Sequence, residues 1–228
     1  MRRDLDRPPE LSVVIPVHND ERALMRILEQ LDGRDFEIIV VDGQSTDASL
    51  AVARQYGAIT LRCAPGRGHQ LNLGFAQATG AWIWLLHADS EVCDAMLDFL
   101  ETLPRQPGWG RFDVRLEGSS PLLRAVGFLM NLRSRVTGIC TGDQGIYVHR
   151  ELIDGIGGIP QQPLMEDIEL SKRLKRHSPP NCPRLKLITS ARRWESRGVL
   201  PTVLTMWGYR LAYWFGADPE RLARRYYS

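Results

Sequence analysis

Polar residues that can bind a nucleotide or a metal ion follow three short apolar runs in the sequence. His18 follows LSVVIPV, Asp42 follows FEIIVV, and His87 with Asp89 follows WIWLL. Helical patterns separate these runs, and such alternation predicts a parallel sheet, whose ligands bind beyond the carboxyl ends of its strands. We therefore expect the polar residues to converge in one cleft. Asp42, taken alone, is equally typical of a turn.

His87 and Asp89 have the residue types of a metal site. They are two positions apart after the most apolar run, so both side chains can point into one cleft. Asp oxygen and His nitrogen suit Mn²⁺, and Asp oxygen suits Mg²⁺. Such an ion would stabilise the charge that develops on a diphosphate leaving group. The alternative is a plain helix cap at Asp89 or Ser90.

Two acids, Glu166 and Asp167, begin a helix predicted over residues 165–176. Acids at this place complement the helix dipole. They are also candidates for a general base that accepts a proton from an acceptor hydroxyl. Asp143, in the polar segment TGDQG, is the second candidate.

Arg67 lies between two glycines in a predicted loop, where its guanidinium can reach phosphates. The segment has neither the Walker spacing nor the GxGxxG spacing, so a plain glycine turn is the alternative.

Predicted strands alternate with predicted helices in the first half of the chain, and these elements must position the polar residues. Helices are expected after Asn19 or Asp20, after Ser45 or Thr46, and up to Ala78. Together with the strands they predict right-handed βαβ units. The predicted strands cover residues 11–17, 36–41, 59–62, 82–86, 109–117, 146–148 and 185–188. Later helices are predicted over residues 121–135, 165–176 and 199–215.

The composition indicates a globular protein with a real core. Of the 228 residues, 43% are hydrophobic and 25% are charged, which suits one α/β domain. We expect a nucleotide-binding half over residues 11–90, an acceptor half over 91–195 and a helical tail over 196–228. The four cysteines lack metal-ligand spacing, which favours reduced thiols and a cytoplasmic location. No signal peptide, membrane span or nucleic-acid partner is expected.

The C-terminal segment is basic. From Arg184 onward it contains nine Lys or Arg and three Asp or Glu residues. This excess suits an anionic partner such as phosphate or a membrane surface, and equally a solvated basic helix. Its predicted helix has an apolar stripe, which we expect to pack on the domain; a peripheral contact with the inner face of a membrane is the alternative. The stripe consists of Leu200, Val203, Leu204, Trp207, Leu211, Trp214 and Phe215.

Five segments together resemble the family 2 glycosyltransferases of GT-A fold, a nucleotide-diphospho-sugar transferase fold with a Rossmann-like, mostly parallel sheet. They occur in the family's order over residues 11–176: LSVVIPVHND, IIVVDGQSTD, LNLGFAQATG, WLLHADS and LMEDIELSKRL. A narrower match is to a small bacterial branch described as radical-SAM/selenodomain-associated transferases. HADS, GDQG, LMED and the SARRW region carry that match.

The resemblance implies an inverting displacement that moves a sugar from a UDP- or GDP-sugar to an acceptor hydroxyl with the help of Mn²⁺ or Mg²⁺. Asp89 matches the last acid of the family's DxD motif and would hold the metal ion. Asp167 matches the base of the ED motif, and Glu166 would support it. The expected nucleotide contacts are Pro16, His18, Asp42, Arg67 and His87.

Two positions depart from the family pattern. His87 replaces the first acid of DxD, and Ser190 stands where QxxRW has glutamine, so a polymerase is not implied. Asp143, Arg193 and Trp194 are expected to contact the acceptor or the diphosphate. A nucleotidyltransferase and a non-catalytic nucleotide-sugar binding module are the rival functions. The first would have a glycine-rich basic loop after the first strand, where this chain has PVHND.

Overall fold

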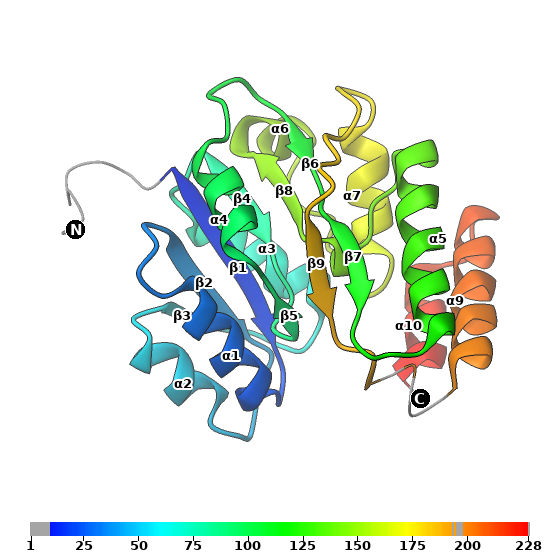
Figure 1. The fold of residues 1–228 in the computed structure, drawn as a ribbon, viewed down its shortest axis with the longest axis horizontal. Coiled ribbons are helices and arrows are strands. Elements are labelled where there is room, and N and C mark those ends of the chain that lie inside the picture. The colour runs from blue at the N-terminus through cyan, green and yellow to red at the C-terminus, as the bar shows by residue number, and fades with distance from the viewer. Residues whose placement is uncertain (1–9, 193, 195–197, 228) are drawn as a thin grey trace.

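The structure, a computed structural model, describes residues 10–192, 194 and 198–227 (Figure 1). Its main sheet has six strands in the order β3-β2-β1-β4-β8-β6. The parallel pairing of the first four strands confirms the predicted βαβ arrangement. These strands are β1 (Leu11–Val17), β2 (Glu37–Asp42), β3 (Ile59–Arg62) and β4 (Trp82–Leu85).

Alternate residues of β1 point into two separate parts of the core. Val13 and Ile15 pack with Leu24 and Leu28 of helix α1 (Glu21–Leu31). Val14 belongs to the cluster on the other face, which contains residues of α3 (Arg67–Gln77). A strand covered on both faces needs a continuous apolar run, and LSVVIPV is such a run. The connection between β2 and β3 contains α2 (Ser49–Gln55).

The second half of the chain differs more from expectation. The predicted strand over 109–117 is two strands, β6 (Trp109–Gly110) and β7 (Asp113–Leu116). The chain changes sheets between them: β6 pairs with β8 (Ile146–His149), whereas β7 joins a three-stranded sheet of order β5-β9-β7. This sheet also contains β5 (Ser90–Glu91) and β9 (Lys186–Thr189). Sequence analysis missed β5 and two helices, α4 (Asp94–Glu101) and α6 (Arg150–Gly155).

Four helices of the second half of the chain lie on the side of the molecule opposite α1 and α2 (Figure 1). Figure 1 shows α5 (Pro121–Thr137) and α9 (Val199–Trp214) side by side. Val199 and Val203 of α9 pack with Val126 of α5. The other two helices are α7 (Glu166–Leu174) and α10 (Pro219–Tyr227), and residues of both share a cluster with tyrosines of α9.

The expected packing of the C-terminal stripe is wrong for most of its members. Leu204, Trp207 and Trp214 are 72%, 65% and 70% exposed, and Leu200, Leu211 and Phe215 are exposed as well. Helix α9 is apolar around most of its circumference, so a second face, with Val203, Tyr209 and Tyr213, packs against the domain instead. No helix among the described residues is both long and apolar enough to cross a membrane.

Candidate functional site

A cavity of about 570 Å³ lies beyond the carboxyl end of β4. Its wall is built by the segment after β4, the start of α3, the start of α7, the chain after β9, and helices α5 and α9. The cavity brings together most of the residues singled out from the sequence. Those that line it are Arg67, His87, Asp89, Asp143, Glu166, Asp167 and Trp194.

His87 lies between two carboxylates. Its Nδ1 atom is 3.4 Å from Oδ1 of Asp143 and 3.9 Å from Oδ1 of Asp89. Burial raises the pKa of the Asp89 carboxyl, while the positive charges of Arg192 and Arg67 oppose that change. An added cation would favour the ionised form of this carboxylate.

The donor atoms at this place suit a divalent ion that binds together with a diphosphate. Asp89 and His87 have the types of ligand that Mn²⁺ accepts. Within the described part of the chain, no three His, Cys, Asp or Glu side chains are arranged to hold a metal ion by themselves. The remaining ligands would therefore have to be oxygen atoms of the substrate or water.

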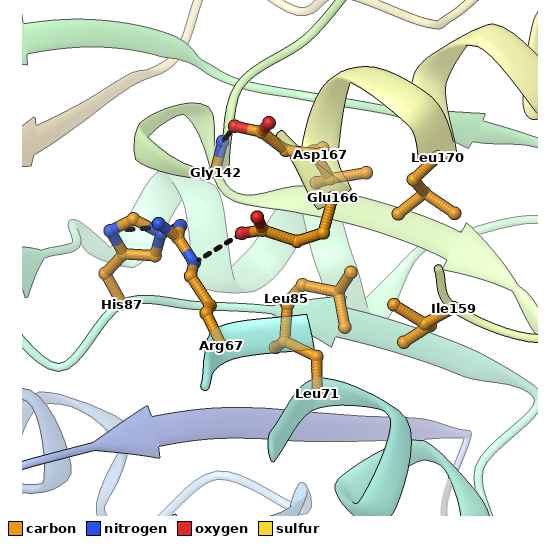
Figure 2. A pocket seen from close by; sticks show the side chains of 10 residues that line it. Arg67, Leu71, Leu85, His87, Gly142, Ile159, Glu166, Asp167 and Leu170 are labelled. Atoms are coloured by element: carbon orange, nitrogen blue, oxygen red, sulfur yellow. Dashed lines mark hydrogen bonds and ion pairs between the residues drawn. The ribbon is translucent and has the colours of Figure 1, made fainter. Parts of the chain in front are cut away.

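Arg67 is in a helix rather than in the predicted loop. Helix α3 begins at Arg67, directly after Gly66, whose φ of 150° is hard for other residues to adopt. A Cβ atom on Gly68 would lie 2.6 Å from the carbonyl oxygen of Gln162, so this turn must approach the neighbouring backbone without a side chain. Figure 2 shows Arg67 pointing across to α7, where its Nε is 3.1 Å from Oε1 of Glu166.

Glu166 is buried beside Arg67. Glu166 is only 4% exposed. Burial raises the pKa of its carboxyl to about 7, while the positive charge of Arg67 acts to lower that pKa. The pairing fixes the start of α7 relative to the start of α3. Glu166 is therefore well placed to position its neighbour Asp167.

The Asp167 carboxylate is held by backbone hydrogen bonds. Its Oδ2 accepts the Gly142 N–H at 2.9 Å (Figure 2), and its Oδ1 accepts the Ile168 N–H at 2.7 Å. A Cβ atom at Gly142 would lie 1.8 Å from Nη2 of Arg67 and 2.5 Å from Nε2 of His87, so a side chain at this position would displace the side chains of both residues. Asp167 lines the large cavity and also a small one of about 10 Å³ that Figure 2 shows.

Three of the expected nucleotide contacts line neither of these two cavities: Pro16, His18 and Asp42. His18 is exposed, and its Nδ1 is 2.7 Å from the carbonyl oxygen of Gly43. The Asp42 carboxylate is fully buried, accepts the Ser45 N–H at 3.0 Å, and is 3.2 Å from Nε of Arg62. In this structure Asp42 therefore braces the turn after β2, and its contact with a nucleotide stays a prediction.

The structure adds two residues that sequence analysis missed. Arg192 lines the cavity and pairs with Asp20, whereas the expected Arg193 lies outside the described residues. The SARRW segment signals this region, but only the fold shows that Arg192 faces the cavity. Gln70 is buried and donates to the carbonyl oxygens of Val17 and Val41, which joins the ends of β1 and β2. No sequence pattern marks it.

Comparison with known proteins supports the assignment of these residues to a known family. The model of glycosyl transferase family 2 matches residues 12–105. A beta-monoglucosyldiacylglycerol synthase of Synechocystis sp. is 26% identical over 195 residues, which are 74% of this chain and 41% of the relative. An undecaprenyl-phosphate 4-deoxy-4-formamido-L-arabinose transferase of Enterobacter sp. is 33% identical over 94 residues, 35% of this chain and 29% of the relative. The chain thus spans less than half of the length of these relatives.

Solved structures share the fold. A mannosyltransferase of Pyrobaculum calidifontis in complex with GDP-Man and Mn²⁺ has a TM-score of 0.63 at 19% identity, over 91% of this chain and 62% of that one. A glucosyl-3-phosphoglycerate synthase of Mycobacterium tuberculosis with Mn²⁺ and UDP has a TM-score of 0.55 at 17% identity, over 79% and 71%. The narrower resemblance to the radical-SAM-associated branch stays a prediction. Residues 12–105 thus resemble the family 2 glycosyltransferases, and the described part of the chain has the GT-A fold of these solved structures.

Proposed function

We propose that this protein moves a sugar from a nucleoside-diphosphate sugar to an acceptor hydroxyl by an inverting, metal-assisted displacement. One observation carries the proposal: a single cavity is lined by Asp89 after β4 and by Asp167 at the start of α7. An inverting displacement needs a base on the side of the sugar opposite the leaving diphosphate. Two acids on different walls of one cavity suit these two tasks.

The donor is a UDP- or GDP-sugar in this proposal. Support comes from the two solved structures, which contain GDP-Man with Mn²⁺ and UDP with Mn²⁺. Asp89 and His87 would hold the ion, which supplies positive charge for the leaving diphosphate. Arg67 and Arg192 line the same cavity and add two guanidinium groups near this end. Pro16, His18 and Asp42 would lie toward the base and ribose, as the family motif implies.

The acceptor side belongs to the second half of the chain. Asp167 would accept the proton of the attacking hydroxyl, and Glu166 would position it through its pair with Arg67. Asp143 and Trp194, from the same half of the chain, also line the cavity, and Asp143 lies 3.4 Å from His87. This division supports a single domain with a nucleotide-binding half over 11–90, an acceptor half over 91–195 and a helical tail over 196–228.

The proposed function is tested by incubating the protein with a panel of nucleotide sugars, with and without Mn²⁺. We expect at least one donor to be hydrolysed slowly, and only with the metal ion, and to raise the melting temperature more with the metal ion than without it. Release of pyrophosphate from a nucleoside triphosphate and a sugar phosphate would instead indicate a nucleotidyltransferase. Stabilisation without turnover, even when candidate acceptors are added, would indicate a binding module.

The exposed apolar stripes suit a membrane surface. One stripe is on α9, and the other is on α5, with Leu122, Phe128, Leu129, Leu132 and Val136. Leu129 and Trp207, one from each stripe, both line the cavity, so the stripes meet at its rim. Exposed apolar patches of this kind mark interaction sites. We call the two stripes together the α5–α9 face.

The charge of this face favours an anionic lipid surface as its occupant. Helices α5 and α9 contain four arginines and no Asp or Glu. Arg124 is exposed, Arg135 pairs with Asp113, and Arg133 and Arg210 line the cavity. Two relatives carry diacylglycerol and undecaprenyl phosphate in their names, which is consistent with an acceptor on a lipid. The protein would thus act as a peripheral membrane enzyme, with its cavity opening toward the lipid headgroups.

We expect the protein to float with phosphatidylglycerol vesicles at low salt and to dissociate as salt is added. Leu204→Gln and Trp214→Gln should each weaken vesicle binding by about tenfold, because each removes an exposed apolar side chain whose burial in the lipid is worth about 1.5 kcal/mol or more. Met25→Gln, which changes a 40% exposed methionine on α1, should bind as the wild type does.

Two outcomes would remove the membrane proposal. One is the absence of vesicle binding at low salt. The other is a dimer in solution that Leu204→Gln dissociates, since the α5–α9 face would then be covered by a second copy of the chain.

A further inference from the structure

Two arginines that the proposed mechanism does not use line the acceptor side of the large cavity. Arg133 comes from α5 and Arg210 from α9. Among the described residues, Nε and Nη2 of Arg133 and Nη2 of Arg210 are buried and have no hydrogen-bond partner. Buried guanidinium nitrogens are normally paired, because removing a cation from water is costly unless an anion or hydrogen bonds compensate.

The pKa of Arg133 reflects the cost of burying its charge. Burial lowers the pKa of Arg133, and the nearby carboxylates of Asp167 and Asp143 only partly oppose that change. The described residues contain no carboxylate in an ion pair with Arg133 or Arg210. A guanidinium still stays protonated near neutral pH, so it remains a charge that lacks a close counter-charge.

Position and chemistry together indicate the ligand. Arg133 is close enough to Asp167 for their charges to interact, so a group bound to Arg133 would lie beside the proposed base. A planar guanidinium with several free N–H donors matches the oxygens of a phosphate group. Helices α5 and α9, which carry the two arginines, also contribute the apolar side chains of Leu129, Met130 and Met206 to the cavity wall.

We propose that Arg133 and Arg210 bind the phosphate group of the acceptor, so that the acceptor is a phosphorylated compound whose hydroxyl reaches Asp167. This inference rests on the proposed function, because it takes the bound phosphate compound to be the acceptor. The phosphate site itself does not depend on the donor. The phosphate group belongs either to a lipid headgroup or to a soluble phosphate ester. The arginines would recognise the same chemistry in both.

The first experiment measures binding of inorganic phosphate to the full chain by calorimetry, without nucleotide. Arg133→Gln and Arg210→Gln should each weaken phosphate binding by about tenfold or more, since each removes a charge-assisted hydrogen bond. Arg124→Gln is the matched control, because it removes the same charge from an exposed position on α5. Arg210 lies on the outer helix, so its variant keeps the test valid if Arg133→Gln fails to fold.

The second experiment distinguishes the two sources of phosphate. Vesicles with phosphatidic acid, a phosphate monoester, are compared with phosphatidylglycerol vesicles of equal surface charge. If both arginine variants lose their preference for phosphatidic acid, the site binds the phosphate group of a lipid headgroup. If only inorganic phosphate binding falls, the acceptor is a soluble phosphate ester.

Unchanged affinity for inorganic phosphate in both Arg133→Gln and Arg210→Gln overturns the proposal. The result is separable from the test of the proposed function. A protein that turns over no nucleotide sugar but binds phosphate through these arginines would keep the phosphate site and lose the transferase activity.

Discussion

Asp167→Asn should leave donor and metal binding intact and lower the transfer rate by about a hundredfold to ten-thousandfold. An acceptor hydroxyl is a poor nucleophile until a carboxylate takes its proton during the attack. Asparagine has almost the same shape, and its amide oxygen can still accept the Gly142 N–H that Asp167 accepts at 2.9 Å. The variant therefore removes the basic group and keeps the contact with Gly142, while it loses the hydrogen bond that Oδ1 accepts from the Ile168 N–H.

The measurement is the rate of sugar transfer at saturating donor, together with the affinity for the nucleoside diphosphate in Mn²⁺. Glu169→Gln is the control on the same helix, because Glu169 pairs with Arg173 and does not line the cavity. If Asp167→Asn transfers sugar at nearly the wild-type rate, Asp167 is not the base. Asp143→Asn would then be the next variant, since Asp143 is the other candidate carboxylate in the cavity.

Asp89→Ala should abolish the metal-dependent part of nucleoside diphosphate binding, a loss of about a hundredfold or more. The ion contributes several kcal/mol of charge stabilisation, and Asp89 is its proposed carboxylate ligand. The partly buried Asp89 carboxylate has Arg67 and Arg192 as the nearby positive charges. Without Asp89, these arginines would still attract the diphosphate, so weak binding that does not depend on metal should remain.

Calorimetry with and without Mn²⁺ separates these two parts of the affinity. Asp154→Ala, at an exposed position on α6, is the control for loss of one negative charge. His87→Asp should keep metal-dependent binding and shift the preference toward harder ions such as Mg²⁺, because it replaces a nitrogen ligand with oxygen. Unchanged affinity of Asp89→Ala in Mn²⁺ would show that the ion is held elsewhere or is not needed.

The parallel half of the fold was predictable because its signals are local. Each apolar run of the first half is long enough for one strand, and Leu24, Ile27, Leu28 and Leu31 on α1 are all buried as their spacing predicts. Strands of this kind bring their carboxyl ends to one edge, so the location of His87 and Asp89 followed from order alone. The second half was less predictable, since short strands such as β5 depend on pairing with β9, which is distant in sequence.

By itself, the sequence determined the α/β class, the edge of the sheet at which the cavity lies, and the acids that follow β4 and begin α7. Only the tertiary structure decided which charges meet. Arg67 and Glu166 belong to different helices, and their contact at 3.1 Å depends on how α3 and α7 pack. Tertiary packing also decides which face of α9 is buried, because this helix has apolar residues on both sides. Periodicity shows that a helix has an apolar face, but only the neighbouring helices α5 and α10 decide which face is buried and leave Leu204 and Trp214 exposed.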